Sequence, residues 1–299
     1  MPVILVTGKG GQVGFELQRS LAVLGRVVAL DRTECDLSQP ESIRAAVQRI
    51  RPDVIVNPAA YTAVDKAESD QLAALAVNGT APGILAQEAA QLGSLLVHYS
   101  TDYVFAGDDQ PEAYNEAAKP APRSVYGQTK LVGEQSILAA HERHLILRTS
   151  WVYGAYGANF LKTVLRLLEE RDELKIVADQ IGAPTAASLI ADVTAQLVAR
   201  YLRAGDTDYP YGTYHLSASG ETSWYGYAYY VAQQAHLAGL PLKTALERIL
   251  PIPTSAYPLP APRPANSRLD THKLRATFGL SLPEWQAGID QALALLLRR

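Results

Sequence analysis

The sequence of 299 residues has little cysteine, little excess charge of either sign and no long apolar run. Its single cysteine, Cys35, excludes an internal disulfide and a cysteine-rich metal cluster. The formal net charge of -3 gives no basic surface for nucleic acid and no polybasic arm for a membrane. No run approaches the roughly 20 apolar residues of a membrane span, and no signal-like segment opens the chain. We therefore expect a soluble, cytoplasmic protein that acts on small molecules and binds neither nucleic acid nor membrane.

A glycine-rich turn between a strand and a helix is the first feature that points to a ligand. The apolar run 3–6 is typical of a strand buried on both faces, and an apolar pattern of helical period begins at Val13. Between them, Gly8, Gly11 and Gly14 allow a tight turn, close approach of a pyrophosphate and close packing of helix on strand. The N–H groups at the helix start would hold that diphosphate. The alternative is a flexible glycine turn, which the flanking strand and helix disfavour.

A second strand-like run, 26–30, ends at Asp31, about twenty residues after the glycines. A carboxylate at this place accepts hydrogen bonds from the adenosine ribose of NAD, whereas the neighbouring Arg32 could contact the 2′-phosphate of NADP. The sequence therefore leaves the choice between NADH and NADPH open. Asp36 and Leu37 follow, and we interpret them either as an adenine contact or as the cap of the next helix.

Two further strand-like runs complete a repeating strand–helix pattern. Residues 53–57 lead into small residues against which a dinucleotide could lie, and residues 95–99 follow a helix expected from about residue 77 to 92. The alternation predicts an α/β fold of Rossmann type with a doubly wound parallel sheet. We expect a dinucleotide-binding domain over residues 1–150, to which later segments return, and a smaller C-terminal substrate-binding lobe over residues 151–299.

Tyr126 and Lys130 stand four residues apart, so on a helix they share one face. An unperturbed tyrosine has a pKa of about 10 and is a poor acid at neutral pH, but an adjacent cation lowers that pKa. Thr101 follows the run 95–99 at the edge expected for the cofactor, where its hydroxyl can donate to a carbonyl oxygen. Each residue taken singly also fits a surface position or a strand end. Together they predict a carbonyl reductase site.

These motifs resemble the short-chain dehydrogenase/reductase superfamily in its extended, sugar-nucleotide branch. The resemblance covers nearly the whole chain in order. The stretches that carry it are residues 8–14, 57–68, 98–105, 126–130, 148–154, 179–185, 253–258 and 263–270.

The resemblance implies reduction of the C4 ketone of a thymidine-diphosphate 4-keto-6-deoxyhexose by NADPH or NADH. It makes Tyr126 the proton donor, Lys130 its activator and a ligand of the cofactor ribose, and Thr101 the third catalytic hydroxyl. The cofactor contacts that it implies are Gly8, Gly11, Gln12, Val13, Asp31, Asp36, Leu37, Ala60, Tyr61, Thr62, Tyr126 and Lys130. The substrate contacts that it implies are Thr101, Asp102 and Trp151.

Some members of this branch form dimers that magnesium bridges through glutamates. Glu16 matches one such position, but Ser188 occupies another, and the histidines lack ligand spacing. We therefore predict no metal site, and a homodimer is an expectation without a metal bridge.

Two features of the second half each have two interpretations. Trp151 follows the strand-like run 144–149 and could stack on a sugar or base, or anchor the packing of the lobe. Residues 251–264 carry six prolines. The resemblance makes this stretch an ordered loop over the nucleotide with Arg263 as a phosphate ligand, and the alternative is a proline-stiffened surface loop.

Two other functions stay open from the sequence. One is a different sugar-nucleotide 4-ketoreductase or an epimerase of the same branch. The other is a non-catalytic regulatory subunit like that of methionine adenosyltransferase, against which the intact Thr101, Tyr126 and Lys130 argue.

Overall fold

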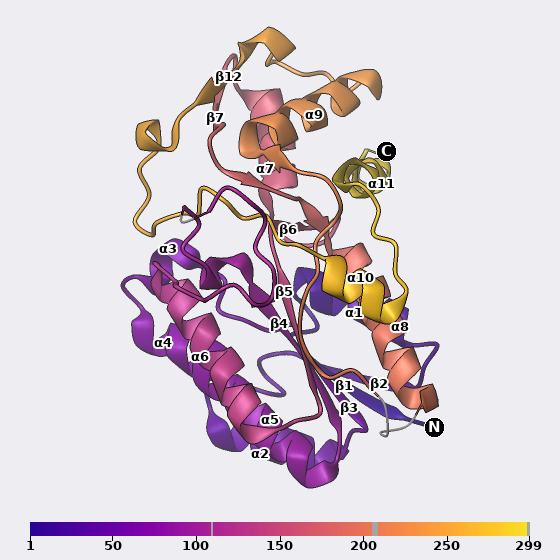
Figure 1. The fold of residues 1–299 in the computed structure, drawn as a ribbon. Helices are drawn as coiled ribbons and strands as arrows, with labels where there is room; N and C mark the ends of the chain where they lie inside the picture. Colours follow the sequence, from indigo (N-terminus) through magenta and orange to yellow (C-terminus); the bar gives the residue numbers. More distant parts are fainter. Residues whose placement is uncertain (109, 205–208, 298–299) are drawn as a thin grey trace.

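A computed structural model describes residues 1–108, 110–204 and 209–297 of the chain. Within these residues, six strands form one parallel sheet in the order β10-β5-β4-β3-β1-β2 (Figure 1). Its strands are β1 (Val3–Thr7), β2 (Arg26–Leu30), β3 (Val54–Asn57), β4 (Leu95–Thr101), β5 (His144–Thr149) and β10 (Gly212–His215). The predicted α/β fold of Rossmann type is confirmed.

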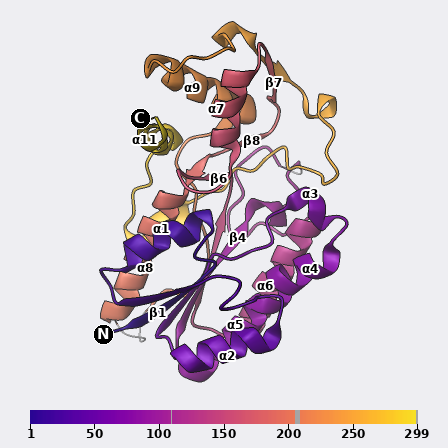
Figure 2. The same cartoon turned by 180° about the vertical axis from the view of Figure 1, so that it is seen from behind.

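Helices cover both faces of the sheet because its strands are apolar on both sides. Ile4 and Val6 of β1 pack in one layer with α1 and α8, whereas Leu5 packs in the other with α2, α5 and α6. Neighbouring residues of a strand thus serve opposite layers, as its pleat requires. Figures 1 and 2 show these two helical layers on opposite sides of the sheet. The helices are α1 (Gln12–Leu21), α8 (Ala187–Ala204), α2 (Pro40–Ile50), α5 (Ala81–Leu92) and α6 (Val125–Ala140).

The strand order creates a switch point between β1 and β3. The chain runs from β1 outward to β2 and then returns past β1 to β3, so the connections after β1 and β3 leave in opposite directions. In open α/β sheets, ligands bind outside the carboxyl ends of the strands at such a point. The glycine turn follows β1 and residues 58–63 follow β3, so both lie where a dinucleotide is expected.

The helix expected from about residue 77 begins earlier than predicted. After the short α3 (Val64–Ala67), α4 (Gln71–Leu75) runs into a π-helical turn over Ala76–Thr80 and then into α5. The extra residue in a π turn disturbs the 3.6-residue apolar period from which the start was predicted. Such turns occur often at functional sites.

A second group of elements lies beyond the carboxyl ends of the sheet (Figure 1). There, α7 (Phe160–Glu170), α9 (Trp224–Leu237) and α11 (Trp285–Leu296) share an apolar core with the paired strands β7 (Leu174–Val177) and β12 (Ile249–Ile252). Smaller elements are β6 (Val152–Tyr153), β8 (Ile181–Gly182), β9 (Thr185–Ala186), β11 (Thr222–Ser223) and α10 (His272–Phe278). The division at residue 150 stays a prediction. Among the described residues, no helix combines the length and apolarity needed to cross a membrane.

Candidate active site

The glycine turn joins β1 to α1 with its backbone folded closely on itself. The Gly11 N–H donates to the Gly8 carbonyl oxygen at 2.9 Å, and α1 begins at the next residue with no side chain capping its start. A β-carbon at Gly14 would lie 2.1 Å from the Gly8 carbonyl oxygen, so only glycine lets the helix pass this close. Val13 packs against the sheet core. The first-turn N–H groups of α1 are therefore available for an anion such as a pyrophosphate.

Gln12 connects this turn to the segments beyond the sheet. Its Oε1 accepts a hydrogen bond from Asn159 Nδ2 at 2.9 Å, and its Nε2 donates to the Val152 carbonyl oxygen at 3.4 Å. Asn159 also caps the start of α7 by accepting from the Lys162 N–H at 3.1 Å. One predicted cofactor contact thus lies where the glycine turn and the lobe segments meet.

Asp31, at the end of β2, belongs to a small ionic cluster. Lys9 Nζ lies 3.1 Å from Asp31 Oδ2 and 2.5 Å from Glu34 Oε2. Hydrogen bonds from Thr33, followed by the contact with Lys9, lower the pKa of Asp31 to about 2. Arg32, the basic residue singled out from the sequence, is 81% exposed. The cation that touches the expected ribose carboxylate is Lys9, which sequence reasoning missed although it stands inside the glycine turn.

The Asp36 side chain stabilises the turn just before α2 by hydrogen bonds to Ser38. Its Oδ1 accepts from the Ser38 N–H at 2.9 Å and from Ser38 Oγ at 2.7 Å, while Arg32 Nε lies 3.4 Å from its Oδ2. The N-cap residue of α2 is Gln39, so Asp36 does not cap the helix itself. Leu37 is buried in the layer of α2 and α5. The adenine contact of these two residues stays a prediction.

Ala60, Tyr61 and Thr62 lie just past β3 and are held by Asn78 of the π turn. Asn78 Oδ1 accepts from the Tyr61 N–H at 2.8 Å, and Asn78 Nδ2 donates to the Tyr61 carbonyl oxygen at 3.0 Å. The N–H and the carbonyl oxygen of Tyr61 are both hydrogen-bonded to Asn78. The segment 60–62, which was predicted to face the dinucleotide, is therefore held in place. Sequence reasoning missed Asn78, which no local signal distinguishes from other polar residues of a helix.

The start of α6 brings Tyr126 to the end of β4. Ser124 caps the helix by accepting from the Gly127 N–H at 3.1 Å. A β-carbon at Gly127 would lie 2.2 Å from the Tyr103 carbonyl oxygen, so helix and post-strand segment touch backbone to backbone. The Tyr126 hydroxyl consequently lies near the Thr101 hydroxyl, and the Tyr126 and Tyr103 rings meet edge to face with their centroids 5.4 Å apart.

The Tyr–Lys spacing predicts that Lys130 lowers the pKa of Tyr126, and this activation stays a prediction. Burial raises the pKa of Tyr126 to about 12, while the Thr101 hydroxyl lowers it and the charge of Asp102 raises it. The phenol therefore keeps its proton at neutral pH, as a proton donor must.

Lys130 is buried on the same helix and is held by β4. Its Nζ donates to the Tyr99 carbonyl oxygen at 2.5 Å and lies 3.1 Å from His98 Nε2. Burial lowers the pKa of Lys130 to about 8, and Glu134, one helical turn away, raises it. An ammonium has three N–H donors, so two contacts leave one N–H for a ligand.

Asp102 shares this buried space with Thr101. Thr101 Oγ1 donates to Asp102 Oδ1 at 3.0 Å and accepts from the Tyr103 N–H at 3.2 Å. Burial raises the pKa of Asp102 to about 6, against the lowering effect of hydrogen bonds from Ser267 and Thr101. The structure thus brings two of the three predicted substrate contacts together with Tyr126, and adds Ser267.

Trp151, the third predicted substrate contact, lies beyond β5 with a positive φ of 49°. Its ring stacks on Trp224 of α9 with centroids 3.7 Å apart, and it packs against the lobe core. These contacts are the ones expected of a lobe-packing anchor. Stacking of Trp151 on a sugar or base stays a prediction.

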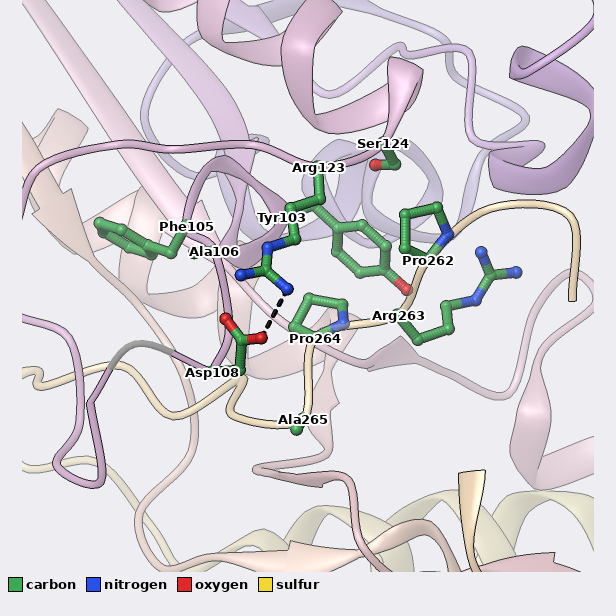
Figure 3. Close-up of a pocket in the computed structure, with 10 residues that line it drawn as sticks. All are labelled: Tyr103, Phe105, Ala106, Asp108, Arg123, Ser124, Pro262, Arg263, Pro264 and Ala265. Carbon is green, nitrogen blue, oxygen red and sulfur yellow. Dashed lines mark hydrogen bonds and ion pairs between the residues drawn. The ribbon is translucent and has the colours of Figure 1, made fainter. Parts of the chain in front are cut away.

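A pocket of about 100 Å³ lies beside Tyr103 (Figure 3). Arg123 and Ser124 line one side of it, and residues 262–265, at and just past the end of the proline-rich stretch, line another. Arg263 Nη2 lies 2.7 Å from Asp65 Oδ2, and the Ala265 carbonyl oxygen accepts from a backbone N–H of β8 at 2.8 Å. The stretch is therefore ordered by the groups on which it lies, and its closure over a nucleotide stays a prediction.

The positions considered for a bridging metal lie apart from these contacts. Glu16 Oε2 lies 3.5 Å from Arg19 Nε on α1, and Ser188 lines a different pocket with residues of α8 and α11. In the described part of the chain, no group of three His, Cys, Asp or Glu side chains could hold a metal ion.

The parallel sheet, the glycine turn and the Thr101–Tyr126–Lys130 group define a nicotinamide-dependent oxidoreductase of the short-chain dehydrogenase/reductase class. The family described as RmlD substrate binding domain matches residues 1–298. The chain is also 50% identical over 295 residues to dTDP-4-dehydrorhamnose reductase of Escherichia coli K12, covering 97% of this chain and 96% of that one. This chain belongs to the dTDP-4-dehydrorhamnose reductase family.

Two further similarities agree with this family. The chain is 49% identical to dTDP-4-dehydrorhamnose reductase of Burkholderia thailandensis, which covers 98% of this chain and 99% of the relative. It is 36% identical to dTDP-4-dehydrorhamnose reductase of Bacillus anthracis, solved in complex with NADP, with a TM-score of 0.89 over 98% of this chain and 99% of that chain. The resemblance found in the sequence is confirmed over the whole length.

Proposed function

We propose that this chain reduces the C4 ketone of dTDP-4-dehydro-6-deoxy-L-mannose to give dTDP-L-rhamnose, with NADPH or NADH as the hydride donor. The observation that carries the proposal is that Thr101, Tyr126 and Lys130 come together at the carboxyl end of β4, beside the switch point of the sheet. The family to which the chain belongs supports the choice of substrate.

The residues around the switch point fit a dinucleotide. The start of α1 has no capping side chain, and a β-carbon at Gly14 would fill the close approach to Gly8. Lys9 and Asp31 supply a cation and a carboxylate at the expected ribose end. The residues that would hold the cofactor are Gly8, Gly11, Gln12, Val13, Asp31, Asp36, Leu37, Ala60, Tyr61, Thr62, Tyr126 and Lys130.

When bound, the nicotinamide supplies the hydride that reduces the carbonyl carbon. The Thr101 hydroxyl, which donates to Asp102 in this structure, turns to the carbonyl oxygen and stabilises its negative charge. Tyr126 gives its proton to the same oxygen. With a pKa of about 12 the phenol is still a stronger acid than the product alcohol, since water, a comparable O–H acid, has a pKa of about 15.7. Lys130 would donate its remaining N–H to the cofactor ribose.

On the sugar nucleotide, Asp102 would accept a hydrogen bond from a ring hydroxyl, and Arg263 would contact the diphosphate. Asp102 lies beside Thr101, and Arg263 reaches the same region from the proline-rich stretch. Trp151 is retained as a candidate contact to the sugar or base.

A panel of dTDP- and UDP-linked 4-keto sugars, with loss of NADPH and NADH absorbance as the readout, tests the proposal. We expect oxidation of the nicotinamide in equal amount to the 4-keto-6-deoxy sugar, fastest with the dTDP-linked substrate. An epimerase would interconvert sugars without consuming added NADPH. A regulatory subunit would reduce no sugar and would be recovered with a stoichiometric partner.

Three further expectations accompany the proposal: a homodimer, a domain boundary near residue 150, and action in the cytoplasm. The separate apolar core of α7, α9 and α11 supports the boundary. Sedimentation of the purified chain tests the homodimer, which would be excluded by a monomer at micromolar concentration.

A further inference from the structure

Buried polar side chains form a line of hydrogen bonds across the carboxyl end of the sheet and end at Lys130. Thr7 Oγ1 lies 2.5 Å from Asn57 Oδ1, and Asn57 Nδ2 lies 3.0 Å from His98 Nδ1. On the far side of the same imidazole, His98 Nε2 lies 3.1 Å from Lys130 Nζ. None of the four residues is more than 1% exposed, so water does not substitute for any of these contacts.

The line follows from the register of β1, β3 and β4. Asn57 is the register partner of His98, and the residue before Asn57 pairs with the residue before Thr7. Two residues earlier on each strand, an apolar side chain packs in the layer that contains α6. The two-residue period of a strand therefore turns all three polar side chains toward α6 as well. Polar side chains at three adjacent buried positions cost folding free energy unless each polar group is hydrogen-bonded.

The chemistry of each group fixes how the hydrogen bonds run. A charged Lys130 can only donate, so His98 Nε2 must accept, and a neutral imidazole then carries its proton on Nδ1. That proton requires an acceptor, which the amide of Asn57 supplies by turning its oxygen to His98 and its nitrogen to Thr7. The opposite sense, with Thr7 donating to Asn57 and Asn57 to His98, satisfies every member only when Lys130 is neutral. The direction of the whole line is thus tied to the charge on Lys130.

We propose that His98 is a positioning residue of the active site, which holds the Lys130 ammonium through Nε2 while Asn57 and Thr7 fix its imidazole. The inference rests on the proposed function, since it assigns the third N–H of Lys130 to the cofactor ribose. With Tyr99 and His98 accepting the other two, only one direction is left for that N–H. Thr7 directly precedes Gly8, so the same line of bonds connects Lys130 to the turn that would bind the pyrophosphate.

The electrostatic surroundings of Lys130 leave this role to His98. Glu134 is the nearest carboxylate on α6, but it is already paired with Arg148 of β5 at 2.6 Å. Burial and the charge of Lys130 hold the pKa of His98 well below its usual value, so the imidazole stays neutral and able to accept. The other titratable groups on the elements packed around Lys130 are Tyr99 on β4, Asp102 and Tyr103 after β4, Tyr126 on α6, His144 on β5, Asp65 and Lys66 on α3, and Glu88 on α5.

Two substitutions at His98 separate its two nitrogens. In His98→Gln the side-chain amide reaches the position of Nε2 and can still accept from Lys130. In His98→Asn the amide reaches the position of Nδ1, which keeps the contact with Asn57 but leaves Lys130 one acceptor short. Binding of NADPH is titrated by fluorescence without any sugar, between pH 7 and 9.5, and kcat and thermal unfolding are measured on the same preparations.

We expect His98→Asn to weaken NADPH binding and to lower kcat by about 10- to 100-fold, since a small misplacement of a catalytic group has effects of that size. His98→Gln keeps the acceptor for Lys130 but loses the contact with Asn57, so we expect a smaller loss of about 3- to 10-fold. In the wild type, NADPH binding weakens as the pH rises through about 8 and Lys130 loses its proton. In His98→Asn this weakening begins at lower pH, because the lost acceptor favoured the charged amine.

Equal losses in both variants, with an unchanged pH dependence of NADPH binding, would make His98 a packing residue and overturn the proposal. If His98→Asn does not fold, Thr7→Val keeps the shape of the far end of the line and removes its hydroxyl. A loss of about 3- to 10-fold in NADPH affinity supports the proposal, and an unchanged affinity contradicts it. Because the titration contains no sugar, it still decides the role of His98 if the wild type binds NADPH and reduces no ketosugar.

Discussion

The phenol of Tyr126 is half-buried, and its burial raises the pKa to about 12, so the group is protonated at neutral pH. Thr101 and Asp102 tune this single group from one side, and the backbone contact at Gly127 places it from the other. At the residue scale, protonation of the substrate therefore depends on one hydroxyl, whose removal leaves the surrounding packing intact.

Tyr126→Phe should lower kcat by about 10²- to 10⁴-fold, the usual contribution of general acid catalysis. The ring and its edge contact with Tyr103 remain, so the midpoint of thermal unfolding should change little. The Kd for NADPH should rise only slightly, because Lys130 and the glycine turn still hold the cofactor. Steady-state rates with the ketosugar and a fluorescence titration with NADPH check this. A variant with near-wild-type kcat would remove Tyr126 from the mechanism.

The preference for NADPH or NADH also depends on single residues. Asp31 repels a 2′-phosphate, and Lys9, 3.1 Å away, attracts one. Lys9→Ala should therefore lower kcat/KM for NADPH relative to NADH by roughly 10-fold, within the range of about 1 to 4 kcal/mol for a partly solvated charge contact. Arg32→Ala is the matched control with a smaller effect, because that side chain is 81% exposed and lies beside Asp36.

Asp31→Ser should shift the same ratio toward NADPH, and both shifts should shrink at higher ionic strength. The kcat/KM values for the two cofactors, measured at two salt concentrations, provide the readout. An NADPH/NADH ratio that ignores Lys9→Ala would place the 2′-phosphate away from the end of β2.

At the scale of elements, strands and motifs were predictable because their signals are local. Each of the five strands from β1 to β5 is an apolar run next to a polar or glycine-rich segment, and Tyr126 and Lys130 share a face because four residues span one helical turn. Contacts across strands were not predictable. The pairing of Asn57 with His98 depends on strand register. The hydrogen bonds of Asn78 depend on a π turn, which the spacing of apolar residues in the sequence does not indicate. The pairing of β10 with β5 likewise depends on the chain, which returns to the sheet more than sixty residues after β5.

The packing of α1 on the glycine turn gives an element-scale prediction with an internal control. Alanine usually stabilises a helix interior by about 1 kcal/mol relative to glycine. At Gly14, however, its β-carbon would lie 2.1 Å from the Gly8 carbonyl oxygen, whereas at Gly10 it would meet nothing within 4 Å. Gly14→Ala should therefore destabilise the protein by about 1 to 3 kcal/mol, the usual cost of overpacking, and weaken NADPH binding at least 10-fold.

Gly10→Ala should leave the unfolding midpoint and the Kd for NADPH close to those of the wild type. Thermal unfolding and NADPH titration of both variants make the comparison. If Gly14→Ala were as stable as the wild type and bound NADPH equally well, the close approach of α1 to the turn would not be required.

At the scale of the whole molecule, residues 253–270 run from the lobe to the sheet domain past the active site. The Asn266 N–H donates to the Gly107 carbonyl oxygen at 2.6 Å, and Ser267 contacts Asp102. Arg263 is held by Asp65, which follows β3. This stretch therefore joins both predicted domains to the catalytic group, and its basic residue is placed where a diphosphate is expected.

Arg263→Met and Asp65→Asn break the same ion pair but differ in whether the cation remains. A hydrogen bond to a charged group contributes about 1.5 to 3 kcal/mol, so Arg263→Met should raise KM for the sugar nucleotide by roughly 10- to 100-fold. Asp65→Asn keeps the guanidinium and should leave that KM within about 3-fold of the wild type. Equal increases in KM for both variants would show that the pair only fastens the stretch.

In the proposed reaction, a hydride passes from the nicotinamide to C4 of the sugar while Tyr126 supplies the proton. It is tested most directly by turnover of the dTDP-linked 4-keto-6-deoxy sugar with NADPH deuterated at the transferred position, followed by mass spectrometry and NMR of the product. We expect one deuterium at C4 for each NADPH oxidised, and no such product from Tyr126→Phe within the time of a wild-type turnover. Deuterium elsewhere in the sugar, or conversion of the sugar with no NADPH oxidised, would contradict it.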